Sequence, residues 1–262
     1  MTVSFRLSAN ISMLFADRHF PRRIEAAAAA GFPAVECQFP YAFDRAEILS
    51  ALNGHGLPMN SINTPVGDLQ RGEFGFAALP GKQDQFRSAF EKALEWGAAL
   101  GVETIHCMSG APGADDLSAA RKTFMNNLSW AAPLARAQNI TLLIEPLNSR
   151  DRPGYFVSRS DDVAALIAEL GEPNVKLLFD IYHIQIMEGD ISCRLERHWP
   201  VIGHVQVAGV PARNEPDVGE LAISNIMIGL AKMGWRGFVG AEYNPVSQTE
   251  DGLGWARPWL NA

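Results

Sequence analysis

The sequence predicts a single (β/α)₈ barrel, of the TIM barrel type, that covers residues 1–262 as one domain. Short apolar runs alternate with longer amphipathic segments, and this alternation occurs eight times. A chain of 262 residues also has the usual length of such a barrel. A doubly wound open sheet gives the same alternation, but the count of eight and the chain length favour the closed barrel.

The strands are predicted from short runs of apolar residues. The runs LLI at 142–144 and LLF at 177–179 are continuously apolar, as expected of strands that are covered on both faces. The predicted strands cover residues 5–10, 34–39, 58–63, 104–107, 141–145, 176–180, 204–207 and 237–243.

The helices are predicted from their apolar periodicity and from their ends. Gly31 and Gly101 follow helical segments, where glycine suits the left-handed position that ends a helix. Ser160, which precedes Asp161 and Asp162, is expected to cap a helix with its side chain. The connection 64–81 is expected to be a loop over an active site. The predicted helices cover residues 19–30, 44–53, 83–100, 117–137, 160–170, 190–199, 220–233 and 250–259.

Composition narrows the class of protein. The net charge of −7 would repel a nucleic-acid backbone, so no nucleic-acid partner is expected. The first residues lack the pattern of a signal peptide, and no apolar run approaches the roughly 18 residues of a membrane helix. The cysteines, Cys37, Cys107 and Cys193, are too sparse for a disulfide framework. A soluble, cytoplasmic protein without a membrane partner is therefore expected.

Four polar residues stand where predicted strands end: Glu145, Asp180, Gln206 and Glu242. Their spacings of 35 residues (145 to 180), 26 residues (180 to 206) and 36 residues (206 to 242) each approximate one strand–helix repeat. Functional side chains of a (β/α)₈ barrel come from the carboxyl ends of its strands. We therefore expect the four side chains to point to one spot.

Three carboxylates buried together repel one another, and a divalent cation removes that cost. Three carboxylates with one amide oxygen suit Mg²⁺ or Mn²⁺ better than a metal that prefers thiolates. Each acid taken alone is more typical of a surface or capping residue. The repeat spacing of all four favours a metal site.

Several segments together resemble the hydroxypyruvate isomerase branch of the xylose isomerase-like barrel superfamily, which also includes ketose 3-epimerases and endonuclease IV. The resemblance covers almost the whole chain. The segments that carry it are LSANISMLF, GFPAVECQFPY, GDLQRGEFGFAALPGK, LLIEPLN, FDIYHIQIMEGD, IGHVQVA, RNEPDVGE and GAEYNP.

The resemblance implies that Glu145, Asp180, Gln206 and Glu242 are the metal ligands, and that Glu145 and Glu242 are the catalytic acid–base pair. Many relatives have histidine where Gln206 stands, whereas the hydroxypyruvate isomerase branch is similar to this chain in having glutamine. Which glutamate acts as acid and which as base is left open.

The resemblance also implies substrate contacts by His183 and Arg213, with Asp151 as the acidic partner of His183. A guanidinium suits a substrate carboxylate, and a surface ion pair of Arg213 with nearby acids is the alternative. His106, with Glu36 and Asn63, is expected to line the pocket or to form hydrogen bonds in the core. Phe74 replaces an arginine expected in similar sequences.

The implied reaction is the isomerisation of a small 2-oxo or hydroxy acid through an ene-diolate, with hydroxypyruvate to tartronate semialdehyde as the first candidate. The alternatives are a 2-oxo-tetronate isomerase and, more remotely, an endonuclease IV-like metal phosphodiesterase, which six histidines and the negative charge disfavour. A Schiff-base aldolase is disfavoured by the positions of the lysines. Relatives are often dimers or tetramers, and the aromatic segment 255–259 is a candidate contact with a neighbour.

Overall fold

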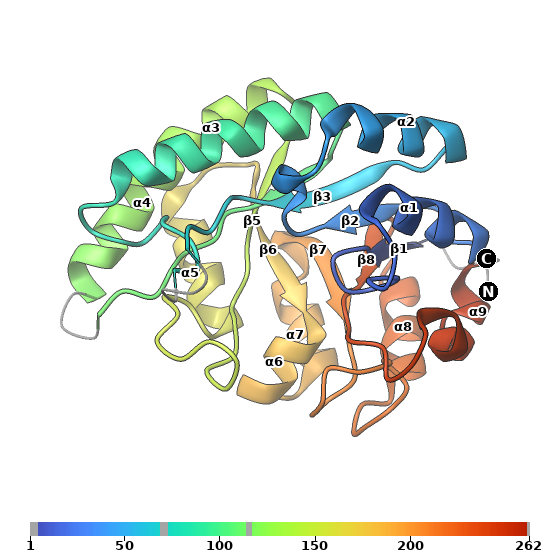
Figure 1. Cartoon of the computed structure of the whole chain (residues 1–262). Coiled ribbons are helices and arrows are strands. Elements are labelled where there is room, and N and C mark those ends of the chain that lie inside the picture. Colours follow the sequence, from blue (N-terminus) through green and yellow to red (C-terminus); the bar gives the residue numbers. More distant parts are fainter. Residues whose placement is uncertain (1–4, 69–72, 114–116, 261–262) are drawn as a thin grey trace. The chain divides into compact units, whose positions relative to one another are not determined.

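The computed structural model describes residues 5–68, 73–113 and 117–260 (Figure 1). Its eight strands follow one another in sequence order in a closed barrel, which confirms the predicted fold class. The chain forms two compact units. Unit 1 comprises Met1–Asn60, Asp180–Arg197 and His204–Ala262, and unit 2 comprises Ser61–Phe179 and His198–Gly203. The single domain expected over residues 1–262 stays a prediction.

Unit 1 is built around strand β8, which pairs in parallel with both β1 and β7, while β1 also pairs with β2. In this register Gln206 of β7 lies opposite Gly240 of β8. The strands with residues in this unit are β1 (Arg6–Asn10), β2 (Val35–Cys37), β7 (Ile202–Val207) and β8 (Phe238–Ala241). Its helices are α1 (Phe20–Ala29), η1 (Pro40–Ala42), α2 (Arg45–His55), α6 (Ile181–Met187), α7 (Ile191–His198), α8 (Ile223–Lys232), η5 (Thr249–Trp255) and α9 (Arg257–Leu260).

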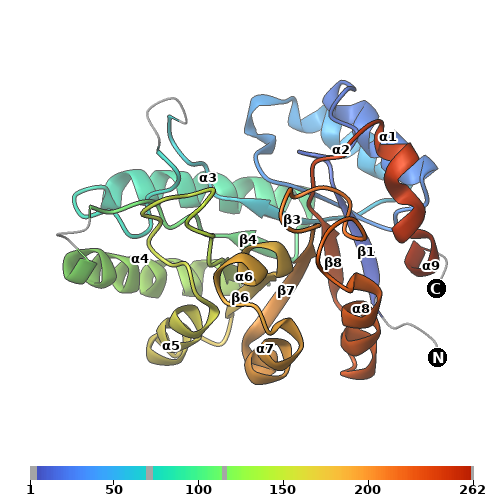
Figure 2. The ribbon, with the colours of Figure 1, turned by 90° about the horizontal axis from the view of Figure 1, so that it is seen from below.

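Unit 2 contains parallel pairs from β3 to β4, β4 to β5 and β5 to β6. Its long helices α3 and α4 lie side by side in Figures 1 and 2. The strands are β3 (Met59–Asn63), β4 (Thr104–His106), β5 (Thr141–Ile144) and β6 (Val175–Asp180), and the helices are α3 (Gln83–Leu100), α4 (Leu117–Ala137), α5 (Ser160–Leu170) and η4 (Trp199–Val201).

Most predicted element ends agree with the structure, and one capping prediction is wrong. Gly31 and Gly101 have the expected positive φ, at 88° and 69°. The N-cap position of α5 is occupied by Arg159, not by Ser160, and no side chain forms a capping hydrogen bond at this end of the helix. Ser160 is already inside α5, and its Oγ lies 3.1 Å from Nε2 of the buried His198. Its hydroxyl therefore joins α5 to the segment around His198 instead of satisfying the helix end.

Two local features differ from the predicted pattern. Helix α6 begins immediately after β6, at a place where no separate helix was predicted. The segment predicted as a helix at 250–259 consists of the 3₁₀ helix η5 and the short helix α9. The ring of Trp255 packs against Tyr243 and that of Trp259 stacks on Phe5. Both rings thus pack within unit 1, and the contact of this segment with a neighbour stays a prediction.

Two of the cysteines, Cys37 and Cys107, are buried, and Cys193 is exposed. Burial raises the pKa of the Cys37 and Cys107 thiols to about 12. Within the described part of the chain, no helix has both the length and the apolar character needed to span a membrane.

Candidate active site

A polar side chain marks the carboxyl end of every strand, either within the strand or directly after it. In this fold class that end carries function. The eight residues, from β1 to β8, are Asn10, Glu36, Asn63, His106, Glu145, Asp180, Gln206 and Glu242. Most are buried, and each unit is described by itself below.

Asp180 is held at the junction of β6 and α6, where its side chain also caps the helix. Oδ1 accepts a hydrogen bond from the backbone N–H of Tyr182 at 2.8 Å. Oδ2 is buried and receives no hydrogen bond from any residue that the structure describes. It lies 3.5 Å from Nη2 of Arg213 and 3.6 Å from Nε2 of His183. Burial raises the pKa of Asp180, against the opposing effect of Arg213.

The side-chain amide nitrogen of Gln206 donates two hydrogen bonds, whereas its amide oxygen accepts none from the described residues. Nε2 donates to Oε1 of Glu36 at 2.7 Å and to Oε2 of Glu242 at 2.8 Å. Oε1 of Gln206 is buried and accepts no hydrogen bond from the described residues. A buried acceptor without a donor is costly, so this oxygen requires a partner of another kind.

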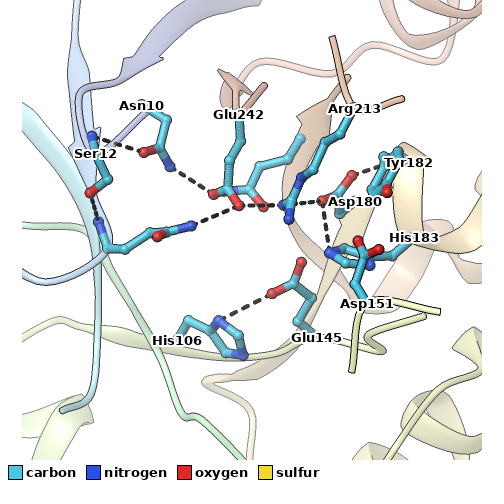
Figure 3. A network of polar contacts seen from close by, with 12 residues as sticks. Asn10, Ser12, His106, Glu145, Asp151, Asp180, Tyr182, His183, Arg213 and Glu242 are labelled. Atoms are coloured by element: carbon cyan, nitrogen blue, oxygen red, sulfur yellow. Dashed lines mark hydrogen bonds and ion pairs between the residues drawn. The ribbon is translucent and has the colours of Figure 1, made fainter. Parts of the chain in front are cut away.

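Glu242 lies directly after β8 and accepts four hydrogen bonds (Figure 3). Oε1 accepts from Arg213 Nη2 at 2.6 Å and from Gln38 Nε2 at 3.0 Å. Oε2 accepts from Asn10 Nδ2 at 2.7 Å and from Gln206 Nε2 at 2.8 Å. Burial raises the pKa of Glu242 to about 7, although Arg213 opposes the shift. A carboxyl with a pKa near neutrality suits proton transfer.

Arg213 supplies the positive charge of this unit's network. Its guanidinium contacts Glu242 and Asp180 and lies 5.0 Å from the ring of Tyr182. Both of these ion pairs are with acids that were predicted as ligands. The backbone of Arg213 has a φ of 58°, a conformation that non-glycine residues adopt at a cost of about 1–3 kcal/mol. Such strain is typical of functional residues.

Glu36 is a second buried carboxylate of unit 1, and it shares the donors Gln206 and Asn10 with Glu242. It is almost fully buried and accepts from His204, Gln206 and Asn10 at 2.8, 2.7 and 3.0 Å. Burial alone would raise the pKa of Glu36, but these three donors outweigh it and hold the pKa below its ordinary value. The expected hydrogen bonding of Glu36 in the core is confirmed.

Sequence reasoning missed the partners of this network. Asn10 and Gln38 stand in the motifs LSANIS and ECQFPY, but their types alone give no signal of function. His204, two residues before Gln206 on the same strand, has its side chain on the same face of the sheet. That alternation was the available signal.

In unit 2, Glu145 follows β5 and pairs with His106 of β4. Oε2 of Glu145 lies 3.3 Å from Nδ1 of His106, as Figure 3 shows. Burial lowers the pKa of His106 to about 3, so the imidazole is neutral at pH 7, with its Nδ1 facing the carboxylate. His106 therefore orients Glu145.

Two residues of unit 2 that the resemblance singled out lie in loops: Asp151 in the loop after β5 and Phe74 in the loop after β3. Asp151 is fixed by Asn148, whose Nδ2 donates to its carboxylate at 3.1 Å and whose Oδ1 accepts from its backbone N–H at 2.8 Å. The predicted pairing of Asp151 with His183 stays a prediction. Phe74 stands where the resemblance implied an arginine, and the guanidinium of Arg152 lies 4.0 Å from its ring centre. The positive charge of an arginine is therefore present beside Phe74, although the arginine is Arg152.

The donor set fits a divalent cation. In unit 1, Asp180 and His183 are buried and offer atoms of the kind that bind a metal ion, and in unit 2 the buried Glu145 offers a carboxylate. The buried acceptors Asp180 Oδ2 and Gln206 Oε1 both lack hydrogen-bond donors among the described residues. Oxygen ligands of this kind are typical of Mg²⁺ and Mn²⁺ sites.

Comparisons with known proteins identify the family of the chain. Residues 24–259 match the family described as xylose isomerase-like TIM barrel. The 2-oxo-tetronate isomerase of Cupriavidus necator is 46% identical over 97% of this chain and 98% of its own length. The hydroxypyruvate isomerase of Escherichia coli is 37% identical over 97% and 99%. The crystal structure of a protein named AP endonuclease, family 2, from Brucella melitensis has a TM-score of 0.95 at 41% identity, covering 97% of this chain and 98% of that one.

Proposed function

The chain belongs to the xylose isomerase-like TIM barrel family, and we propose that it isomerises short 2-oxo acids with the help of Mg²⁺ or Mn²⁺. Relatives at 46% and 37% identity over nearly their full length are named as isomerases of small sugar acids, which supports this class of reaction. The donor set of the site supports the cation.

One observation carries the metal proposal: two buried oxygens, Asp180 Oδ2 and Gln206 Oε1, lack hydrogen-bond donors among the described residues. In a folded protein such acceptors are paired with a donor, water or an ion. We assign Asp180, Gln206, Glu145 and Glu242 as the ligands, with His183 beside Asp180. When bound, the cation would act as a Lewis acid that stabilises negative charge on the substrate oxygens.

The side chains of the protein carry out the remaining steps. Arg213 grips the substrate carboxylate, because its guanidinium is partly exposed and already lies among carboxylates. One of Glu145 and Glu242 removes the proton from the substrate carbon, and the other returns a proton to the neighbouring carbon. The hydroxyl proton passes at the ene-diolate stage from the oxygen that becomes the new carbonyl to the former ketone oxygen, which becomes the new hydroxyl. Four side chains donate to the Glu242 carboxylate and hold it in place: Arg213, Gln38, Asn10 and Gln206.

Two substrates are candidates, and they differ by one CH(OH) unit. The sequence resemblance placed hydroxypyruvate first, whereas the 46% identity to a 2-oxo-tetronate isomerase favours the four-carbon acid. A difference of this size changes transition-state binding by only a few kcal/mol. We propose both as substrates and expect the larger kcat/KM on 2-oxo-tetronate.

The test measures kcat/KM for both acids before and after exhaustive chelation. We expect turnover in the presence of metal, loss of nearly all activity in protein shown to be metal-free, and recovery when Mn²⁺ or Mg²⁺ is added. Full activity of verified metal-free protein would reject the cation. Absence of isomerisation on both acids with metal present would reject the reaction.

The name of the similar protein from Brucella melitensis, AP endonuclease, favours one second candidate, a metal-dependent endonuclease. The net charge of −7 weighs against it, because a DNA backbone is anionic. Cleavage of a duplex with an abasic site, measured on the same metal-loaded preparation, would establish this activity. We expect none.

A further inference from the structure

Gln206 can act as a metal ligand only if its amide is turned the right way, because an amide presents an oxygen on one side and a nitrogen on the other. In the structure its NH₂ group is directed to Glu36 and Glu242, at 2.7 and 2.8 Å. The reversed amide would place its oxygen against two carboxylate oxygens. The two carboxylates together direct the amide oxygen away from themselves, and Glu36 is the one of the two that is not assigned as a ligand.

Glu36 is well suited to this task, because its carboxyl group is contacted by three donors. Oε1 accepts from the amides of Gln206 and Asn10, and Oε2 lies 2.8 Å from Nε2 of the buried His204. Both oxygens of the Glu36 carboxylate therefore act as hydrogen-bond acceptors. His204 anchors the carboxylate through the oxygen that the amides leave over.

The barrel also makes room for this carboxylate. Residue 240, which lies opposite Gln206 in the register of β7 and β8, is a glycine. A Cβ atom at this position would collide with the carboxyl group of Glu36. The backbone of Gly240 has no positive φ that would itself require glycine. The absent side chain is thus explained by the space that Glu36 occupies.

We propose that Glu36, anchored by His204, is a positioning residue that fixes the Gln206 amide with its oxygen toward the metal. This inference rests on the proposed function, because it assumes that Gln206 is a ligand. Neither Glu36 nor His204 is assigned a contact with the cation. They act through Gln206, as residues behind a ligand commonly do.

The first test is Glu36→Gln, which keeps the size of the side chain but replaces one acceptor oxygen by a donor NH₂. The Gln206 amide then keeps only one carboxylate acceptor, Glu242, and that group is itself assigned to the cation, so the preference that fixes the amide orientation is weakened. We expect the dissociation constant for Mn²⁺, measured on metal-free protein by the EPR signal of free Mn²⁺, to rise by about 10- to 100-fold. The melting temperature is measured on the same samples.

The second test compares two replacements of His204. Gln at position 204 can still donate to Glu36, whereas Leu cannot. We expect His204→Gln to retain most of the Mn²⁺ affinity and His204→Leu to lose about as much as Glu36→Gln. If Glu36→Gln fails to fold, this pair decides the question, because a role in stability alone would not distinguish the two by their metal affinity.

The control is His198→Gln in unit 2, a second buried histidine whose partners, Ser160 and Asp161, are not residues of the candidate site. It should lower the melting temperature and leave the Mn²⁺ affinity unchanged. Folded Glu36→Gln with wild-type affinity would overturn the positioning role and leave the proposed function intact. Wild-type protein that binds neither Mn²⁺ nor Mg²⁺ would overturn both.

Discussion

The carboxylate of Glu242 accepts from four donors. Arg213 and Gln38 donate to one oxygen, and Asn10 and Gln206 donate to the other. A cation that uses this carboxylate must share it with these donors. Arg213 is the partner best placed to yield, because its side chain is partly exposed and can turn to a substrate carboxylate.

Because of these four donors, Glu242→Gln should affect both turnover and stability. We expect kcat to fall by about 10²- to 10⁴-fold, the usual effect of removing a general acid or base. The free energy of unfolding should also fall by roughly 1–3 kcal/mol, because the new NH₂ group faces donors in either orientation. Steady-state kinetics and thermal unfolding measure the two effects.

The matched control for this prediction is Glu215→Gln. Glu215 is also a buried glutamate of unit 1, but its Oε1 accepts from the backbone of Val246, outside the network around Glu242. This variant should keep its turnover. Near-normal kcat in folded Glu242→Gln protein would exclude Glu242 from proton transfer.

At the scale of elements, the strands and helix ends that a single local sequence pattern determines were predicted best. Apolar runs located all eight strands to within about two residues, and glycine marked the helix end at Gly101, with a φ of 69°. Ser160 misled because its hydroxyl has a competing tertiary partner, His198, that no local pattern reveals. Helix α6 was missed because Asp180 ends a strand and caps the helix at the same residue.

The same limit applies to the site. The four proposed ligands were found because repeat spacing is visible in the sequence. Glu36 and Asn10 became central only when β1, β2, β7 and β8 lay beside one another in unit 1. Their role depends on side-chain orientation between distant strands, which spacing does not encode.

Helix α2 provides a prediction that concerns one element only. Oδ1 of Asp44 accepts from the backbone N–H groups of Ala46 and Glu47 at 2.7 and 3.4 Å, so it caps the helix. Asp44→Ala should lower the free energy of unfolding by about 0.5–2 kcal/mol, measured by urea denaturation, with kcat unchanged.

Asp84 of α3 is the comparison for this cap. It lies in the first turn of its helix, which has no side-chain cap, and interacts with the helix dipole only through its charge. Asp84→Ala should cost no more than about 0.3–1 kcal/mol. Equal losses in the two variants would show that the Asp44 hydrogen bonds contribute nothing beyond charge.

At the scale of the whole molecule, the acidic groups of the site oppose folding in the absence of a cation. The pKa values of Asp180 and Glu242 are both raised by burial, which means that the folded state disfavours their charged forms. A ligand that binds only the folded protein adds stability according to its concentration relative to its dissociation constant. Metal binding should therefore be visible in thermal unfolding without any substrate.

At a Mn²⁺ concentration of 100 times the dissociation constant, the gain is about 2.7 kcal/mol. For a chain of this length that corresponds to a rise in melting temperature of about 5–10 °C. Asp180→Asn should abolish the rise, because it removes a ligand. The metal-free variant should melt no lower than wild type, since the amide keeps the cap on Tyr182 and removes a buried charge. A Mn²⁺-dependent rise of normal size in this variant would show that Asp180 is not a ligand.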